Sequence, residues 1–159
     1  MLSEIITDNS ILGISWGTTM QEVARQSARK KMNNLTVVQL NGGVSKAALD
    51  THASEIAQIL GDKFQATPYL LPLPAIVDSP EVKKAILSDK NIARTLYLGK
   101  KSEIAMYTIG LFSEQSVLVK ADYFEPKEVK SLLRKGAIGD LCSRIAPFLN
   151  NDFTSFGSK

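Results

Sequence analysis

The sequence contains few of the residues that build metal sites and disulfides. Its 159 residues include a single cysteine, Cys142, and a single histidine, His52. One cysteine cannot form an intramolecular disulfide, so the chain fits a reducing compartment, and we expect a cytoplasmic protein. One histidine and one cysteine predict no zinc site. Because Cys142 lies among Ile138, Leu141 and Ile145, we expect its thiol to be buried as a small apolar group.

Long apolar runs and a strong excess of one charge are also missing. No apolar run reaches about 18 residues, so the sequence predicts no membrane span. The first ten residues lack the charged start and apolar core of a signal peptide. The formal net charge is only +3 and the 19 basic residues are scattered, so we expect no nucleic-acid-binding face. The hydrophobic content of 44% is ordinary for one globular domain.

Short apolar segments alternate along the chain with segments of helical periodicity. The expected strands are 11–15, 35–40, 64–71 and 103–109, and the expected helices are 20–31, 49–60, 80–88, 91–100 and 126–135. The strand at 35–40 is apolar without alternation, which is typical of a buried parallel strand. This rhythm predicts an α/β fold, with a Rossmann-like parallel sheet and helices on both faces.

The segment 11–20 combines an apolar strand, a tight turn at Gly17 and the start of a helix. The free N–H groups at the start of a helix, together with the helix dipole, favour a bound anion. Thr18 and Thr19 add two hydroxyl donors. Gly17, Thr18, Thr19 and Met20 are therefore candidate phosphate-binding residues. The alternative is that Thr18 or Thr19 simply caps the helix.

Loops that follow parallel strands meet at one edge of the sheet, where ligands bind in this class of fold. Here these loops contain Gly17-Thr18-Thr19, Asn41-Gly42-Gly43, Pro72-Leu73-Pro74 and Gly110. Glycines at such places let a ligand approach the backbone. Neither a Gly-x-Gly-x-x-Gly run nor a Walker A lysine pattern is present, so no dinucleotide or P-loop nucleotide site is predicted.

Three polar side chains at this edge are candidates for ligand recognition. Asn41 carries a donor and an acceptor on one amide, although a turn-forming role explains it equally well. His52 opens the helix after the Asn-Gly-Gly loop, and the alternative is a structural or solvated histidine. Asp140 can accept hydrogen bonds from sugar hydroxyls. Its alternatives are to cap a turn into 141–145 or to pair with Arg144 at i+4 spacing.

Four blocks of the sequence, in one order, resemble the effector-binding domain of SorC-type (sorbitol-operon regulator) bacterial transcriptional regulators. These blocks are Gly13 to Met20 (GISWGTTM), Val38 to Gly43 (VQLNGG), Leu71 to Pro80 (LPLPAIVDSP) and Gly136 to Arg144 (GAIGDLCSR). The chain is most similar to the branch that contains the deoxyribonucleoside regulators of bacilli.

The resemblance implies a fold like that of the sugar-phosphate isomerase and glucosamine-phosphate deaminase group. It also implies a phosphorylated sugar as effector and a homo-oligomeric regulator, dimeric or tetrameric. We expect the sugar end of the ligand to meet Asn41, Gly42, Gly43, His52 and Asp140. No catalytic residue, metal or cofactor is expected, because no activated nucleophile or paired acid and base stands beside these residues.

Two alternatives remain open at this point. The fold also permits a phosphosugar isomerase or deaminase, in which His52 and Asp140 are the only attractive acid–base candidates. A bare oligomerisation module that has lost its ligand is the third possibility.

The sequence departs from the family pattern in three respects. The family has a winged helix-turn-helix domain before this region, and its effector domain continues for about another hundred residues. We therefore interpret residues 1–159 as part of an effector-binding domain without its DNA-binding domain, so that operator DNA would be met only through the absent part. Some relatives carry lysine or arginine at the position of Asn41, where a lysine can form an imine with a sugar aldehyde. Asn41 cannot, which predicts non-covalent binding.

Overall fold

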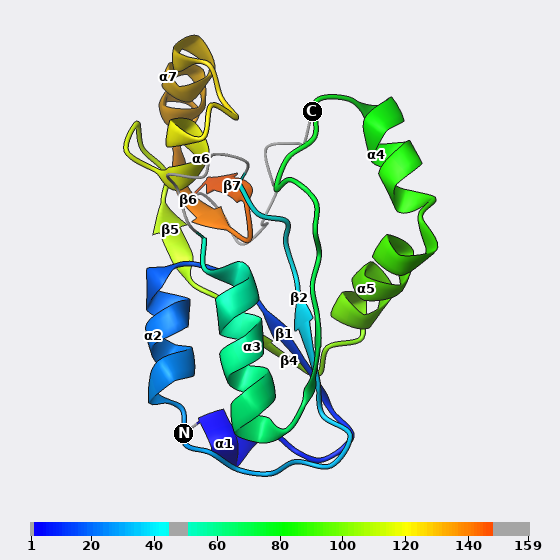
Figure 1. Ribbon diagram of the computed structural model, residues 1–159. Helices are drawn as coiled ribbons and strands as arrows, with labels where there is room; N and C mark the ends of the chain where they lie inside the picture. The colour runs from blue at the N-terminus through cyan, green and yellow to red at the C-terminus, as the bar shows by residue number, and fades with distance from the viewer. Residues whose placement is uncertain (1, 45–50, 148–159) are drawn as a thin grey trace.

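A computed structural model describes residues 2–44 and 51–147 of the chain. Its central feature is a four-stranded sheet in the order β3-β2-β1-β4 (Figure 1). The strands are β1 (Ile11–Ile14), β2 (Thr36–Gln39), β3 (Thr67–Tyr69) and β4 (Ile104–Met106). Every neighbouring pair in this sheet is parallel. The prediction of an α/β fold with a parallel sheet is therefore confirmed.

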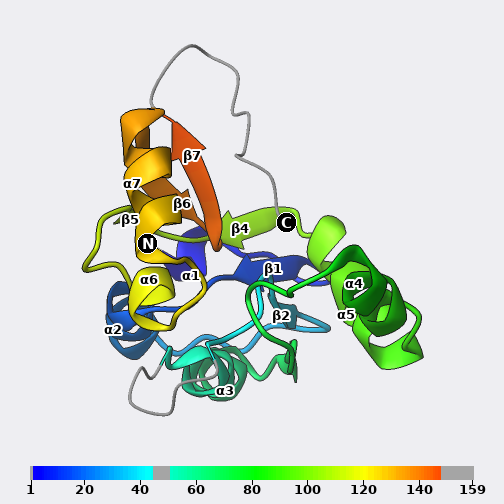
Figure 2. The same ribbon diagram turned by 90° about the horizontal axis from the view of Figure 1, so that it is seen from above.

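Helices cover both faces of this sheet. They are α1 (Leu2–Ile5), α2 (Thr18–Gln26), α3 (Ala53–Phe64), α4 (Pro80–Leu87) and α5 (Lys90–Lys100). Figure 2 shows α2 and α3 on one side of the strands, while α4 and α5 lie apart from these two helices. The chain steps from β1 to β3 in one direction and then returns across the sheet to β4. Crossovers between parallel strands are right-handed as a rule, so such a reversal brings helices to opposite faces of a sheet.

The main core lies between the sheet and α2 and α3. Leu12 and Val37 on the strands and Ile56, Leu60 and Phe64 on α3 are fully buried. Burying one such side chain contributes about 1.5–3 kcal/mol. Helix α4 begins at Pro80 as predicted, and the Ser79 hydroxyl caps it by accepting the Val82 N–H.

Two helix ends differ from the sequence prediction. Helix α2 ends at Gln26, although periodicity extended it to 31. Helix α3 continues through Gly61 to Phe64 and ends at the left-handed Gln65, so the predicted end at 60 is wrong. Gly61 is buried against Ala66 and Pro68, and its small size therefore serves packing. The beginning of the predicted helix, at 49 and 50, lies outside the described residues.

A second, antiparallel sheet in the order β5-β6-β7 was not predicted. Its strands are β5 (Ile109–Leu111), β6 (Ala137–Leu141) and β7 (Arg144–Pro147), accompanied by α6 (Val117–Lys120) and α7 (Pro126–Arg134). Gly110 was expected in a loop but lies in β5 opposite Asp140. The segment 141–145 forms a hairpin and not a helical turn. Pairing between distant residues overrides the local glycine signal here.

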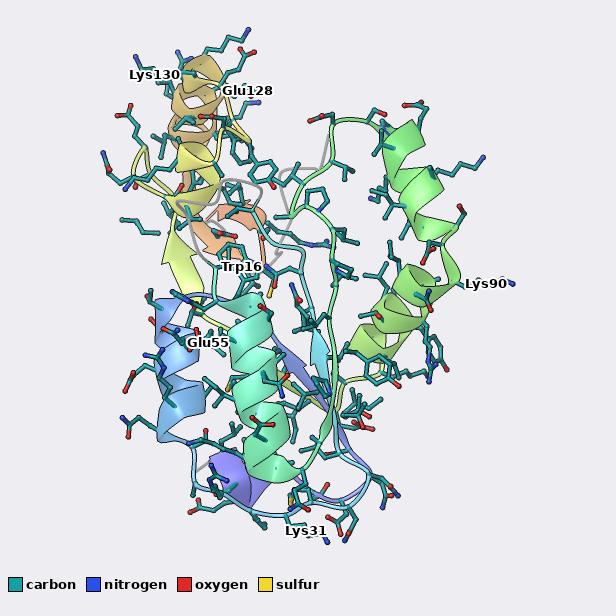
Figure 3. The ribbon with its side chains drawn as sticks, in the orientation of Figure 1. Trp16, Lys31, Glu55, Lys90, Glu128 and Lys130 are labelled. Atoms are coloured by element: carbon teal, nitrogen blue, oxygen red, sulfur yellow. The ribbon has the colours of Figure 1, made fainter. Side chains whose placement is uncertain are left out.

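The small sheet, α6 and α7 lie above the carboxyl edge of the parallel sheet (Figure 1). We call this part, residues 109–147, the cap. Its own core contains Phe112, Leu118 and Val129, and Trp16 packs against both this core and the main one. Figure 3 shows Trp16 at the junction between the two. The cap therefore covers the edge at which ligands bind in such sheets. In the part of the chain that the structure describes, no helix is long and apolar enough to cross a membrane.

Candidate functional site

The end of β1 leads directly into the first turn of α2. Gly17 has φ 122° and ψ 165°, a conformation that side-chain-bearing residues rarely adopt, and it is the N-cap residue of the helix. Its N–H donates to the Thr51 carbonyl at 3.0 Å, and its carbonyl accepts the first helical bond, from Gln21 at 2.9 Å. The N–H groups of Thr18, Thr19 and Met20 thus precede the first helical hydrogen bond.

Thr18 and Thr19 are exposed, whereas Met20 is buried in the main core. No side chain caps α2, so the alternative in which Thr18 or Thr19 is the cap residue is wrong. The strand order places this turn where the sheet reverses direction, between β1 and β4. Crevices at such reversal points are the usual ligand sites of open parallel sheets.

Asn41 joins three segments that are distant in the sequence. Its side-chain oxygen Oδ1 accepts a hydrogen bond from the Ser15 hydroxyl at 3.1 Å. Its Nδ2 donates to the Ser143 hydroxyl oxygen at 2.9 Å. The residue is 7% exposed, so these partners satisfy an amide that would otherwise be costly to bury. The ends of β1 and β2 and the tip of the β6–β7 hairpin meet at this side chain.

The side chain of Gln39 is hydrogen-bonded to the backbone of Asn41. Its Nε2 donates to the Asn41 carbonyl at 2.7 Å, and its Oε1 accepts the Leu71 N–H at 3.1 Å. Sequence reasoning missed this residue. The signal was a glutamine at the end of an otherwise apolar strand, because a buried glutamine needs partners for both ends of its amide.

The loops after β2 and β3 are bonded to each other. A Cβ at Gly42 would lie 2.6 Å from the Pro74 carbonyl oxygen, so only glycine fits there. Gly43 donates its N–H to the Leu73 carbonyl at 3.0 Å and accepts from Ala75 at 2.7 Å. The predicted convergence of the Asn-Gly-Gly and Pro-Leu-Pro loops is confirmed. The indole N–H of Trp16 also donates to the Gly42 carbonyl at 2.7 Å.

Asp140 lies on β6, beside the hairpin tip that Asn41 contacts. Burial raises the pKa of its carboxyl to about 6, although the backbone N–H groups of Ser143 and Arg144 oppose this shift. Its Oδ1 is buried and has no hydrogen-bond partner among the described residues. Asp140 and Arg144 lie on the two paired strands of a hairpin, and it is the backbone of Arg144 that acts on the carboxyl of Asp140. The prediction that the two side chains pair at i+4 spacing is therefore wrong.

His52 begins α3 in a left-handed conformation, with φ 56°. Its Nδ1 lies 3.4 Å from Oε2 of Glu55. Glu55 also accepts from Arg25 at 2.8 Å and Gln21 at 2.6 Å, and these two bonds, in that order, hold the pKa of its carboxyl below its usual range. Figure 3 shows Glu55 between α2 and α3. The imidazole thus lies near a carboxylate at the α2–α3 interface.

A cavity of about 610 Å³ opens beside Asn41, between the β2 and β3 loops, α4, α5 and the hairpin. Its polar lining includes Asn41, Cys142, Ser143 and Arg144, while most of the remaining lining is apolar. Of the predicted sugar-binding residues, Asn41 and Gly42 line this cavity, whereas Gly43, His52 and Asp140 do not. Cys142 is half-buried at the wall of this cavity, whereas the sequence analysis expected it to be fully buried.

Predicted residues therefore occur in two groups, each completed by residues that the sequence analysis did not name as site residues. Ser15, Asn41 and Ser143 form one group, which Asp140 joins through the backbone. Gly17 and the start of α3 form the other, through the Thr51 carbonyl. No group of three metal-ligating side chains occurs among residues 2–44 and 51–147.

A family of sugar-binding domains, Sugar-bind, matches residues 1–148 of the sequence. The chain belongs to this family. The Sugar-bind match covers both the parallel sheet and the cap, so the glycine-threonine turn and the Asn41 network both lie within the matched residues.

Curated relatives of this Sugar-bind chain are regulators. The "Deoxyribonucleoside regulator" of Bacillus subtilis (strain 168) is 38% identical over 143 residues, which are 90% of this chain and 45% of the relative. The "Erythritol catabolism regulatory protein EryD" of Brucella abortus (strain 2308) is 24% identical over 135 residues, or 84% of this chain and 42% of the relative. The chain thus spans less than half the length of these relatives.

Solved structures agree with the family match. A DeoR family transcriptional regulator from Listeria monocytogenes has a TM-score of 0.78 at 28% identity, over 92% of this chain and 57% of that one. Full-length SorC, the sorbitol operon regulator from Klebsiella pneumoniae, has a TM-score of 0.79 at 17% identity, over 98% and 52%. The second likeness shows the fold alone. The sequence prediction of a SorC-type sugar-binding regulator domain is confirmed.

Proposed function

We propose that this chain is the effector-binding part of a transcriptional regulator and that it binds a phosphorylated sugar without converting it. The observation that carries the proposal is the turn at Gly17. There, N–H groups at the start of α2 precede the first helical hydrogen bond, at the reversal point of the sheet. In this proposal Gly17, Thr18, Thr19 and Met20 bind the phosphate.

The sugar end of the ligand meets Asn41, Gly42, Gly43, His52 and Asp140 in this proposal. Asp140 supports it, because a buried carboxylate oxygen without a partner is stabilised when a sugar hydroxyl donates to it. The names of the relatives favour sugars and polyols of nucleoside and polyol catabolism as the parent compounds. The regulator as a whole would meet operator DNA through a domain outside this chain and would act as a homo-oligomer in the cytoplasm.

The positions of the two acid–base candidates support binding without turnover. The His52 imidazole lies beside Glu55, and neither His52 nor Asp140 lines the cavity beside Asn41. An isomerase or deaminase needs an acid or base placed at the reacting carbon. The enzymatic alternative predicts measurable conversion of a phosphosugar that His52→Ala abolishes.

A thermal-shift screen tests the proposal. Ribose 5-phosphate, 2-deoxyribose 5-phosphate, glucose 6-phosphate, fructose 6-phosphate and sorbitol 6-phosphate are each added to the purified chain, with inorganic phosphate and the free sugars as controls. A ligand at a hundred times its dissociation constant stabilises the folded state by about 2.7 kcal/mol. One sugar phosphate should raise the melting temperature more than phosphate or free sugar does. No shift with any compound would contradict the proposal.

A further inference from the structure

The tip of the β6–β7 hairpin has an unusual backbone for its sequence. Cys142 and Ser143 form the two-residue turn, with φ values of 49° and 66°. Two-residue hairpin turns with both φ angles positive favour Asn-Gly and similar pairs, because most side chains make this conformation unfavourable. A residue kept in such a conformation must be held there by its surroundings, which is common at ligand sites.

One side chain of the turn is bonded to the edge of the parallel sheet, and the other lies close to it. The Ser143 hydroxyl oxygen accepts a hydrogen bond from Asn41 Nδ2 at 2.9 Å. The nearby Ser15 hydroxyl opposes the rise that burial causes in the pKa of the Cys142 thiol. The tip is therefore held directly over the ends of β1 and β2, where the phosphosugar binds in the function proposed above.

In the hydrogen-bond network of Ser15, Asn41 and Ser143, the hydroxyl proton of Ser143 has no acceptor among the described residues. The Ser15 hydroxyl donates to Asn41 Oδ1, so the amide of Asn41 is oriented with Nδ2 toward Ser143. The Ser143 oxygen acts as the acceptor in that bond, and its own proton remains available. No side chain or carbonyl in the described part of the chain accepts it in a hydrogen bond. Ser143 also lines the 610 Å³ cavity.

We propose that Ser143 is a specificity-determining residue of the effector site, which donates its hydroxyl proton to an oxygen of the sugar part of the ligand. This inference rests on the proposed function. Asn41 holds the Ser143 oxygen, and the left-handed turn brings the hydroxyl over the sheet edge. The partner is a neutral oxygen acceptor, such as a ring oxygen or a hydroxyl, while the phosphate stays at the threonine turn. Ser143 thereby discriminates between sugars without contributing to phosphate affinity.

Calorimetric titration of the full chain with 2-deoxyribose 5-phosphate, ribose 5-phosphate and inorganic phosphate tests this role. Ser143→Gly removes the hydroxyl and relieves the unfavourable φ, but it also leaves the buried Nδ2 of Asn41 without its acceptor. These two effects on stability oppose each other, so the variant should still fold, which urea denaturation checks. Its affinity for the better of the two pentose phosphates should nevertheless fall about tenfold, while its affinity for inorganic phosphate stays unchanged. Ser143→Ala, which keeps the unfavourable turn, should lose the same affinity.

Gln65→Gly is the matched control. Gln65 also has a positive φ, 53°, and it is exposed at the end of α3, far from the cap along the sheet. That variant should become more stable with no change in affinity for any ligand. Equal affinity of wild type and both Ser143 variants for the pentose phosphates would overturn the role of Ser143 and would leave the proposed function in place. Failure of the wild type to bind either pentose phosphate would overturn the proposed function for pentose phosphates and this inference with it.

Discussion

The parallel sheet and the cap are held together by different interactions. In the parallel sheet, Leu12, Ile14 and Val37 are fully enclosed by α2 and α3. In the cap, Ile109 and Leu111 on β5 are each 73% exposed. Polar bonds such as those from Asn41 to Ser143 and from Tyr123 to the Gly43 carbonyl tie the cap to the sheet edge. The difference teaches that the larger apolar core belongs to the parallel sheet, whereas the cap combines a smaller core with polar groups at the ligand edge.

The largest contrast should appear between a buried side chain of the main core and an exposed side chain of the cap. Phe64→Ala removes a fully buried ring from the main core and should cost about 3–5 kcal/mol of unfolding free energy. Leu111→Ala in the cap should cost less than about 0.5 kcal/mol, since its side chain is largely exposed. Urea denaturation of both variants measures this contrast. Similar losses in the two variants would contradict the division.

The threonine turn should carry the largest effect on ligand affinity. Thr18→Ala with Thr19→Ala removes two exposed hydroxyls next to the α2 N–H groups. Binding of the sugar phosphate should weaken by about 2–4 kcal/mol if both hydroxyls bond to a charged group. Thr67→Ala, an exposed threonine on β3, is the control and should leave affinity unchanged. Unchanged affinity of the double variant, measured by titration calorimetry, would remove the phosphate from this turn.

The buried carboxyl of Asp140 should make the cap sensitive to pH. Its pKa is about 6 in the folded chain, against an ordinary 3.8, so the folded state binds the proton more tightly than the unfolded state does. Stability should therefore fall as pH rises from about 4 through 6, by about 2–3 kcal/mol for this group. Asp140→Asn cannot ionise and should lack this part of the profile. Parallel wild-type and variant profiles from urea melts between pH 4 and 8 would contradict the assignment.

Gln39 gives the smallest expected effect, and it concerns the link between the regions. Gln39→Leu leaves the Asn41 carbonyl and the Leu71 N–H without their buried partner, which should cost about 1–3 kcal/mol. Affinity for the sugar phosphate should fall as well, because the backbone of Asn41 is no longer held. Gln58→Leu on the exposed side of α3 is the control. If Gln39→Leu has the stability and the affinity of the wild type, Gln39 does not hold the backbone of Asn41 in place for the ligand.

The same contrast explains which elements the sequence predicted. Strand β1 is apolar apart from one glycine, and β2 lies in a segment rich in valine and leucine. Ser79-Pro80 is a strong local helix start, so these three elements could be predicted from the local sequence. Strand β5 is short, exposed and contains a glycine, and the Cys142-Ser143 turn lacks the residues that normally mark a hairpin. Their conformations depend on pairing across the chain, which no local pattern records.

The candidate site divides in the same way. The glycine-threonine turn and Asn41 could be proposed because each directly follows an apolar strand. The bond between Asn41 and Ser143 joins residues 102 positions apart, so neither residue type nor spacing could indicate it. Whether His52 and Asp140 meet the ligand stays a prediction.

Backbone amide NMR shifts during titration test the central claim most directly, because they locate each end of the ligand separately. Inorganic phosphate should shift the amides of Gly17, Thr18, Thr19 and Met20 and leave those of the cap unchanged. The sugar phosphate that stabilises the chain most should shift the same amides and, in addition, those of Asn41, Ser143 and Asp140. Shifts confined to the apolar wall of the cavity on α4 and α5, with none at the threonine turn, would contradict the account.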